Sequence, residues 1–194
     1  MRKQPTREKL LDITFDEVYI HGYNATSIDT ILKKASVPKG SMYHHFKSKK
    51  ELVLAMVKER LFIKMDSFFV FELDQNSTVI QHFQGMLKHI SKNHMLIIYG
   101  CPLYRLMVEL SAIDKEFDTI LSSKAIEIQQ NIQQLLQSAI KQGELNSQLD
   151  TDTFSAYMLS AIWGILSLPP SLSSTDNFLK QSHYIIEELK HYKN

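Results

Sequence analysis

Apolar residues recur every three or four positions along this chain, which is the period of an α-helix. In the first such stretch they are Leu10, Leu11, Thr14, Phe15, Val18 and Tyr19. Gly22 predicts the end of this helix, because glycine readily adopts the conformation that follows a last turn. A short second helix would follow, with Thr26 as its N-cap and Asp29 in its first turn, where a carboxylate is favoured. Its inner face would be Ile28, Ile31, Leu32 and Ala35.

The next segment, VPKGSMYHHF, predicts another short helix after a tight break. Pro38 stands at an early position that a helix tolerates, and the inward face would be Val37, Met42 and Phe46. A long helix is then expected from Ser48, whose side chain would cap it together with Glu51 three positions later. Its apolar repeats run through Leu73.

The helical pattern continues to the last residues. We expect helices near 77–94, 103–112, 115–142, 151–168 and 175–192. The breaks between them fall at the segments DQNS, NHMLIIYGCP, AIDKEF, QGELNSQLD and PPSLSST. Strand-like alternation of useful length is not found, so the pattern predicts an all-α fold of about nine helices.

Composition agrees with this fold and limits the location of the protein. Glycine and proline number only six and five among 194 residues, and their scarcity favours helices. The longest mostly apolar stretch, residues 155–170, is shorter than the roughly 18–20 residues of a membrane span. The N-terminus lacks the apolar core of a secretory signal. A single cysteine suits a reducing compartment, so we expect a cytoplasmic protein that neither enters a membrane nor carries a cofactor.

Charge is distributed unevenly along the chain. Residues 1–60 carry twelve Lys and Arg against seven Asp and Glu, whereas residues 61–194 carry ten against fourteen. A cationic N-terminal region on a mildly acidic chain suggests an anionic partner at that end, with nucleic acid as the first candidate. An ordinary fluctuation of surface charge would explain the same numbers.

Two short helices joined by a tight turn and preceded by a longer helix have the plan of a helix-turn-helix. In that plan the second short helix lies in the major groove of DNA. Gly40 would let the backbone approach a phosphate, Lys39 and Ser41 offer donors, and Tyr43 offers a ring and a hydroxyl. His44 and His45 point about 100° apart on a helix, so at least one can face DNA. Further cations, Lys47, Lys49 and Lys50, stand where the next helix begins and attracts phosphate.

The stretch from TREKLL to KSKKEL, residues 6–52, resembles the DNA-binding domain of the TetR family of bacterial transcriptional regulators. The similarity lies in the Gly-Tyr ending of the first helix, the Thr-Ser-Ile start of the second, and the string VPKGSMYHHFKSKKEL. A weaker similarity, YGCPLYRLMVELSAIDKEF, covers residues 99–117 and matches a segment of the family's ligand domain. The resemblance implies a DNA-binding domain at residues 1–47 and a ligand-binding and dimerisation domain at 48–194, with the helix from 48 shared as linker.

The resemblance also implies roles for individual residues. Thr26 would hydrogen-bond a phosphate, and Lys49 would hold the DNA backbone at the start of the long helix. An N-terminal arm of Arg2, Lys3 and Arg7 would follow the DNA. The residues on or beside the recognition helix would be Pro38, Lys39, Gly40, Ser41, Tyr43, His44 and His45. Lys39 is the only long cation among them, so guanine would not be read by arginine.

In this family the last two helices of each subunit form a four-helix dimer interface. The corresponding residues here are Phe154, Tyr157, Met158, Ala161, Ile162, Ile165, Phe178, Ile185, Ile186 and Leu189. Ala161 and Gly164 are small enough to permit close approach of two helices. The alternative is that both helices only close the core of one protomer.

The middle of the chain is rich in aromatic residues and methionine, which form adaptable cavities for apolar ligands. Candidate pocket residues are Phe62, Met65, Phe69, Phe83, Met86, His89, Tyr104, Met107 and Trp163. At helical spacing such residues are more often plain core than ligand contacts. Arg105 and Glu109, four positions apart, would serve either to fix a ligand or as an intrahelical ion pair.

These features together predict a repressor that binds a palindromic operator as a homodimer and is released by an apolar or amphipathic small molecule. An activator of the same plan and a helical protein that never binds DNA remain alternatives. Enzyme motifs such as a glycine-rich phosphate loop are lacking. A metal-responsive regulator would need ligands such as His82, His89, His94 and Cys101, whose spacing is no established pattern, so we expect no metal site. A thiol-responsive regulator would depend on Cys101.

Overall fold

The computed structural model describes residues 5–69, 71 and 77–194. All the regular structure in these residues is helical, apart from one isolated bridge between Leu145 and Lys193. The expected arm residues Arg2 and Lys3 and the predicted helical repeat at Leu73 lie outside the described residues. The chain forms two compact units: an N-terminal unit of Met1–Asp66 with Arg105–Ser122, and a C-terminal unit of Ser67–Tyr104 with Ser123–Asn194.

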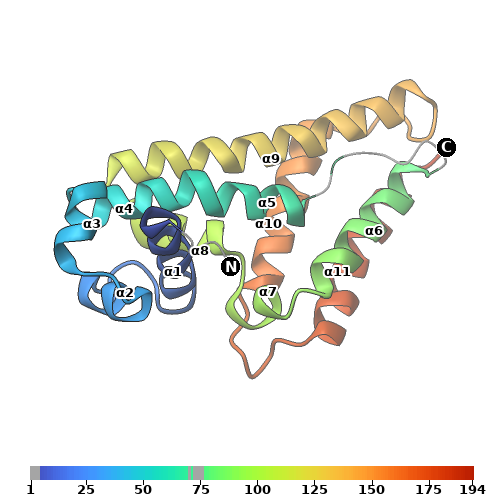
Figure 1. Cartoon of the computed structure of the whole chain (residues 1–194). Helices are drawn as coiled ribbons and strands as arrows, with labels where there is room; N and C mark the ends of the chain where they lie inside the picture. Colours follow the sequence, from blue (N-terminus) through green and yellow to red (C-terminus); the bar gives the residue numbers. More distant parts are fainter. Residues whose placement is uncertain (1–4, 70, 72–76) are drawn as a thin grey trace. The chain divides into compact units, whose positions relative to one another are not determined.

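The N-terminal unit begins with three helices, α1 (Thr6–His21), α2 (Ile28–Ala35) and α3 (Lys39–His45). The long helix follows without interruption as α4 (Lys49–Met56), a π-helical turn η1 (Val57–Leu61) and α5 (Phe62–Phe68). α1 packs against α2, α3, α4 and η1 (Figure 1). The core between them contains Leu10, Leu11, Phe15, Ile31, Leu32, Ala35, Met42, Phe46, Leu52 and Val53. The helix-turn-helix predicted from periodicity is therefore present.

The helix ends follow the expected chemistry, with one correction. Gly22 adopts a φ of 85° after α1, and the Ser48 side chain caps α4 by accepting the N–H of Glu51. The N-cap of α2 is Ser27, whose side chain accepts the N–H of Thr30. The prediction of Thr26 as this cap is wrong, because the Thr26 hydroxyl donates instead to the carbonyl of Gly22 at 2.7 Å.

Ion pairs tie α1 to the π-helical turn. Both Nη atoms of Arg7 donate to the two carboxylate oxygens of Glu59, at 2.7 and 2.5 Å. Arg60, the next residue, pairs with Asp12 and Glu8 of α1. Arg7 was expected in a DNA-following arm, but it lies inside α1 and is already engaged in this fork. This five-residue network joins α1 to the middle of the long helix.

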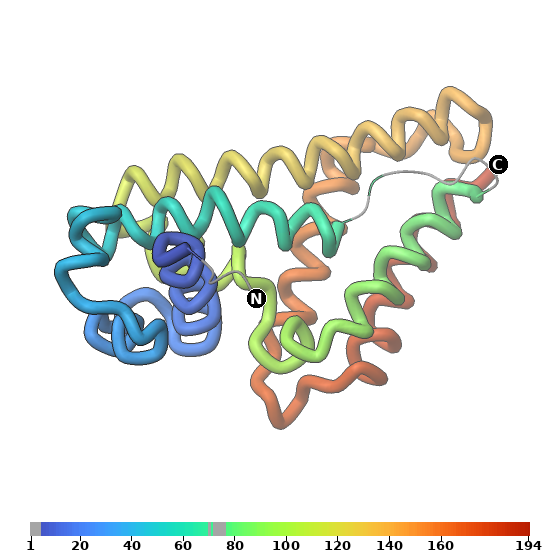
Figure 2. The backbone as a smooth tube through the Cα atoms, viewed as in Figure 1, coloured from blue at the N-terminus to red at the C-terminus, as the bar shows by residue number. Residues whose placement is uncertain are grey.

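The remaining helices are α6 (Val79–Ser91), α7 (His94–Tyr99), α8 (Pro102–Leu110), α9 (Lys115–Lys141), α10 (Thr151–Leu166) and α11 (Thr175–Lys190). In the C-terminal unit α6 runs beside α11, and α10 packs on α11 and α7 (Figure 2). α8 begins in the C-terminal unit and ends in the N-terminal unit, whereas α9 does the reverse. Within the described chain no helix combines the length and apolar character that crossing a membrane requires.

α7 occupies a segment that was predicted to be a break. The Asn93 side chain caps it by accepting the N–H of Leu96, and Gly100 ends it with a φ of 79°. The sequence conceals this helix because six residues are too few to show a period, and because Asn, Gly and Pro around it are typical of loops.

Candidate nucleic-acid interface and effector domain

The outer surface of α3 carries the residues expected to meet DNA. Met42 is fully buried, and Phe46 just after the helix is nearly so, and these two side chains anchor α3 in the core. Tyr43 is 45% exposed. The other exposed residues of this surface are Pro38, Lys39, Gly40, His44 and His45, and Ser41 is half-buried. The side chains that fix α3 are thus separate from those that face outward.

The turn between α2 and α3 is closed by backbone hydrogen bonds. Ser36 adopts a left-handed φ of 52°, and its N–H donates to the carbonyls of Leu32 and Lys33. The next N–H, that of Val37, also donates to Leu32. This turn positions α3 directly after α2, as the helix-turn-helix plan requires.

The start of α2 offers different hydroxyls from the one expected. Thr26 is only 3% exposed and its hydroxyl proton is used by Gly22. Ser27 and Thr30 are exposed, with their hydroxyl oxygens 2.8 Å apart. Sequence reasoning missed these two, although a serine directly before the first apolar residue of a helix is a common cap.

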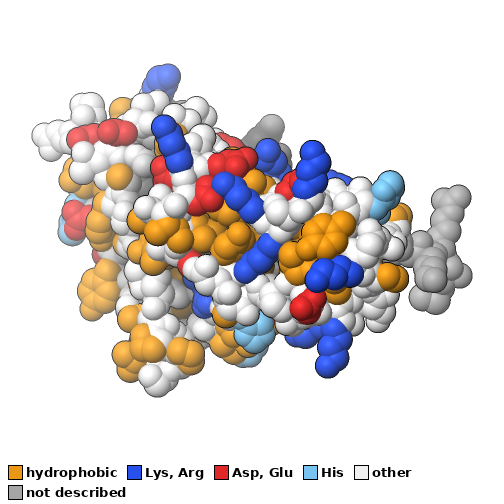
Figure 3. Space-filling view, turned by 90° about the vertical axis from the view of Figure 1, so that its left-hand side faces the viewer, with side chains coloured by type: hydrophobic (Ala, Val, Ile, Leu, Met, Phe, Trp, Pro, Cys, Tyr) orange, Lys and Arg blue, Asp and Glu red, His pale blue; other side chains and the backbone are white. Residues whose placement is uncertain are grey.

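Lysines surround this surface, and Lys and Arg side chains are spread over the side of the molecule on which α2 and α3 lie (Figure 3). Lys39 Nζ is 3.9 Å from the Asp29 carboxylate, and both side chains are well exposed. Lys49 Nζ lies over the ring of Tyr23, 4.2 Å from its centroid. Partial burial lowers the pKa of Lys49, while the nearby charge of Glu109 acts in the opposite direction. Lys49 therefore stands beside the candidate surface, with its ammonium group already in contact with the ring of Tyr23.

Lys50 differs from its neighbour. Its Nζ pairs with Asp114 at 2.7 Å and with Glu116 at 3.1 Å. Hydrogen bonds to these two carboxylates raise the pKa of Lys50 above its ordinary value. The same contact lowers the pKa of Asp114. Lys50 is thus engaged with acidic side chains of its own chain.

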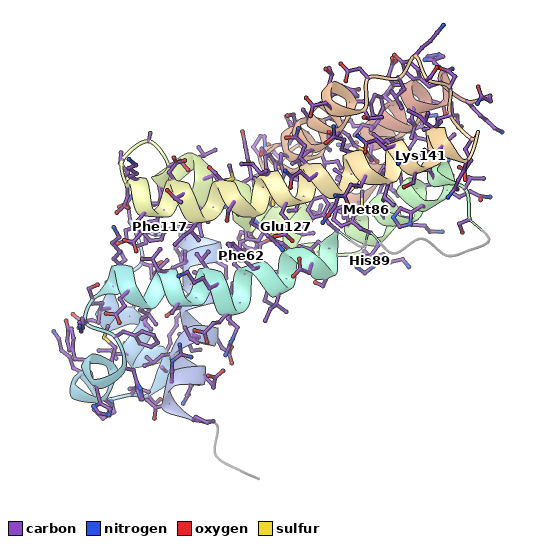
Figure 4. All side chains as sticks on the ribbon, turned by 90° about the horizontal axis from the view of Figure 1, so that it is seen from above. Phe62, Met86, His89, Phe117, Glu127 and Lys141 are labelled. Carbon is purple, nitrogen blue, oxygen red and sulfur yellow. The ribbon has the colours of Figure 1, made fainter. Side chains whose placement is uncertain are left out.

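The candidate pocket residues divide between the two units. Phe62, Met65 and Met107 belong to the N-terminal unit. In the C-terminal unit Phe69, Phe83, Met86 and Trp163 are buried, and Tyr104 stacks on Trp163 with ring centroids 5.1 Å apart. His89 is exposed, and its Nε2 donates to the carbonyl of Ser67 at 3.0 Å. Met86 and His89 both come from α6 (Figure 4).

Two open cavities of ligand size lie in the C-terminal unit. One of about 500 Å³ lies between the start of α10 and the end of α11 and is lined by Phe154, Tyr157 and Tyr192 among others. Another of about 250 Å³ lies between α6 and α11, beside Leu87, Leu179 and Ile186. Their linings contain none of the nine candidate pocket residues.

The residues expected at a dimer interface have two different environments. Buried within the protomer are Phe154, Met158, Ile162, Phe178, Ile185, Ile186 and Leu189. Tyr157 is exposed, and Ala161 and Ile165 are half-buried. The outward side of α10 is a stripe of Tyr157, Ser160, Ala161 and Gly164. At Gly164 an added Cβ would meet no described atom within 4 Å, so this stripe has room for a second helix.

Cys101 is buried, and burial raises the pKa of its thiol to about 11. Because the thiolate is the reactive form, we expect the native protein to react with a thiol reagent such as Ellman's reagent far more slowly than the urea-unfolded chain. The native state holds the thiol proton more tightly than the unfolded chain, whose ordinary pKa is 9.0. Stability should therefore fall as the pH rises from about 9 towards 11.

Absorbance measured with and without urea, and unfolding followed by circular dichroism across this pH range, test the expectation. A cysteine that reacts equally fast in both states would contradict it and would favour a thiol-responsive regulator. Among the residues that the structure describes, no group of three His, Cys, Asp or Glu side chains is arranged to hold a metal ion.

Comparisons with known proteins agree with this geometry. Residues 10–56 match the family described as "Bacterial regulatory proteins, tetR family", and residues 79–175 match "Tetracyclin repressor-like, C-terminal domain". An uncharacterized HTH-type transcriptional regulator of Lactococcus lactis is 34% identical over 129 residues, 66% of each chain. The TetC protein of transposon Tn10 from Escherichia coli is 37% identical over 106 residues, 50% of this chain and 52% of TetC.

The matched regions therefore span between about half and two thirds of these curated relatives. Among solved structures, a TetR transcriptional regulator from Chloroflexus aurantiacus has the same fold, with a TM-score of 0.86 at 22% identity. The superposition covers 100% of this chain and 98% of that one. The chain belongs to the TetR family, whose members are DNA-binding transcriptional regulators and not enzymes.

Proposed function

We propose that this protein is a cytoplasmic repressor that binds a palindromic operator as a homodimer and leaves it when a small apolar or amphipathic molecule binds. The observation that carries the proposal is the surface of α3. Met42 and Phe46 hold the helix in the core, whereas Lys39, Tyr43 and His44 are exposed. A helix held in this way presents its outer residues to a partner, and a helix-turn-helix presents them to a major groove.

Gly40 supports contact with a phosphate. An added Cβ at this position would meet no described atom within 4 Å, so the fold itself does not demand glycine there. Lys39 and Ser41 lie on either side and supply donors. The exposed hydroxyls of Ser27 and Thr30 at the start of α2 replace Thr26 in the proposed phosphate contacts, and Lys49 remains the proposed contact at the start of α4. Pro38 and His45 lie at the two ends of the same surface.

A homodimer is proposed because one helix in one groove reads only a half-site. The exposed stripe on α10, with Ala161 and Gly164 as its small members, would pair with the same stripe of a second copy. The outward side of α11 carries the exposed Leu179 and Tyr184, which would extend the contact. The seven buried residues first expected at the interface would hold α10 and α11 together behind it.

The effector is proposed to bind in the C-terminal unit. The stacked pair of Tyr104 and Trp163 offers aromatic faces, and Phe69, Phe83 and Met86 offer apolar surface of adaptable shape. A molecule that prefers an arrangement unsuited to DNA would shift the population away from the DNA-binding state. The long helix from Lys49 to Phe68 would transmit part of this change.

Genomic footprinting of the purified protein tests the proposal, because the bound sites should be palindromic and few. At these sites we expect the logarithm of affinity to fall steeply with the logarithm of salt concentration. Lys39→Ala should reduce this slope by about 0.9, the effect of one lost phosphate contact. Fluorescence anisotropy of a labelled operator at several salt concentrations gives the slope.

Lys141→Ala provides the control for this measurement, since Lys141 is also exposed but lies at the end of α9 in the C-terminal unit, outside the proposed DNA and dimer surfaces. Its slope should equal that of the wild type. A protein that binds no duplex from its genome, or one that binds with no salt dependence, would refute the proposed function.

A further inference from the structure

One carboxylate holds the turn between α1 and α2. Glu109, at the end of α8, accepts the backbone N–H groups of Tyr23 at 2.8 Å and Asn24 at 2.7 Å. These N–H groups lie in the loop that follows α1 and its C-cap Gly22. A charged acceptor makes both hydrogen bonds strong. Glu109 therefore belongs to the DNA-binding unit, although it is more than eighty residues away in sequence.

Glycine at position 22 permits the close approach of Glu109 to the turn. Its φ of 85° favours glycine, and an added Cβ would stand 3.0 Å from the nearer Glu109 oxygen. The carbonyl of Gly22 in turn accepts the Thr26 hydroxyl just before α2. Glu109, the turn and Thr26, which precedes the N-cap of α2, are thus connected by consecutive hydrogen bonds. A displacement of Glu109 would move the start of α2.

A second contact holds the start of α4. Lys50 pairs with Asp114 and Glu116, which lie between the end of α8 and the first turn of α9. The Asp114 carboxylate also accepts the N–H groups of Glu116 and Phe117. The Phe117 ring packs edge-on against Tyr23 with centroids 5.4 Å apart, and it stands at the beginning of α9 (Figure 4). We name residues 105–117 the α8–α9 corner.

The α8–α9 corner thus contacts the chain on both sides of the helix pair α2–α3. It reaches the α1–α2 turn through Glu109 and the first turn of α4 through Asp114 and Glu116, and α3 lies between α2 and α4 in the chain. Two fixed ends determine where a seven-residue helix can lie. Since α8 begins in the C-terminal unit, the corner is also covalently joined to the part of the chain proposed to bind the effector.

We propose that Glu109 and Lys50 are positioning residues for DNA recognition, through which the α8–α9 corner sets the placement of α3. Lys50 accordingly does not bind phosphate, in contrast to Lys49 beside it. This inference rests on the proposed function, because it assigns a role within DNA binding. By linkage, DNA binding and the state of the corner influence one another equally.

The adjacent lysines provide a matched test, with a duplex from the genomic footprint as the probe. We expect Lys49→Ala to lower the salt slope of binding by about 0.9, as loss of one phosphate contact does. Lys50→Ala should leave the slope unchanged and weaken binding roughly equally at every salt concentration. A slope that falls in Lys50→Ala as it does in Lys49→Ala would overturn the assignment of Lys50.

Glu109→Gln tests the contact with Tyr23 and Asn24, because glutamine has nearly the same side-chain shape as glutamate but no charge. The amide can accept one N–H but turns its own N–H₂ towards the second, so we expect operator affinity to fall about tenfold, a typical size for a coupling between sites. Hydrogen exchange at Tyr23 and Asn24 should be faster in the variant. In the wild type, operator binding should slow exchange at Glu116 and Phe117, and in Glu109→Gln this slowing should diminish. A contact that only stabilises the fold would not give that linkage.

Glu127→Gln is the control, because Glu127 pairs with Lys124 further along α9 and lies outside the corner. If Glu109→Gln fails to fold, Asp114→Asn with Glu116→Gln carries the same affinity test at the contact with Lys50. If the wild type binds the operator and these variants show the same affinity and the same hydrogen exchange as the wild type, the positioning role is overturned. The proposed function would stand in that case. Failure of the wild type to bind any genomic duplex would instead overturn the proposed function.

Discussion

Gly164→Arg yields a monomeric protein that binds its operator at least about 100-fold more weakly, because the second half-site no longer benefits from its tether to the first. Within the protomer the new side chain meets open space, since an added Cβ contacts no described atom within 4 Å. In the proposed dimer it would extend into the second copy. The expected change is therefore confined to association and to DNA binding. Light scattering after size exclusion gives the mass, and anisotropy with a labelled operator gives the affinity.

Gly85→Arg is the matched control. Gly85 lies on α6 and has equally open surroundings, and both substitutions remove a glycine from a helix interior, which favours the helix by up to about 1 kcal/mol. We expect Gly85→Arg to keep the mass and affinity of the wild type. If Gly164→Arg remains a dimer with wild-type affinity, the outward stripe of α10 is not the interface.

Met42→Asp unfolds the helix-turn-helix and abolishes operator binding, whereas Tyr43→Asp abolishes binding without unfolding. Met42 is completely buried and Tyr43, the next residue, is 45% exposed. Shortening a buried methionine to alanine already costs about 2–5 kcal/mol, and a buried carboxylate adds several kcal/mol of desolvation. At position 43 the carboxylate stays in water but would face DNA phosphates, so affinity should fall by about 100-fold or more.

Circular dichroism on heating separates the two variants. Tyr43→Asp should unfold within a few degrees of the wild type, and Met42→Asp should lose helix at a much lower temperature. Tyr43→Phe serves as control for the aromatic surface and should fold normally. A Tyr43→Asp variant that binds the operator like the wild type would remove α3 from the DNA interface.

Periodicity and capping chemistry predicted most of the fold. The helices from α1 to α4 and from α8 to α11 lie where their apolar repeats indicate, because each contributes one buried face over several turns. Two features of the fold were not predicted from the sequence: the helix α7 and the N-cap of α2. The six residues of α7 are too few to show a period, and the choice between Thr26 and Ser27 as cap depends on which hydroxyl meets the carbonyl of Gly22.

The candidate site was predictable only in its local part. The exposed residues of α3 follow from one short amphipathic segment, so sequence alone indicated Lys39, Tyr43 and His44. Lys50 looked equivalent to Lys49, because both are lysines at the start of one helix. Their difference arises from Asp114 and Glu116, more than sixty residues away. Contacts over such separations leave no trace in a local pattern.

The crossing of α8 and α9 between the two units has a consequence for protein engineering. A chimaera that joins the reading head of another regulator at residue 47 would keep Glu109, Asp114 and Glu116 but remove the α1–α2 turn that Glu109 holds. The grafted helix-turn-helix would then meet Glu109, Asp114 and Glu116, whose positions match the contacts of the native domain and not those of the graft. Exchanging residues 1–66 and 105–122 together transplants the complete N-terminal unit.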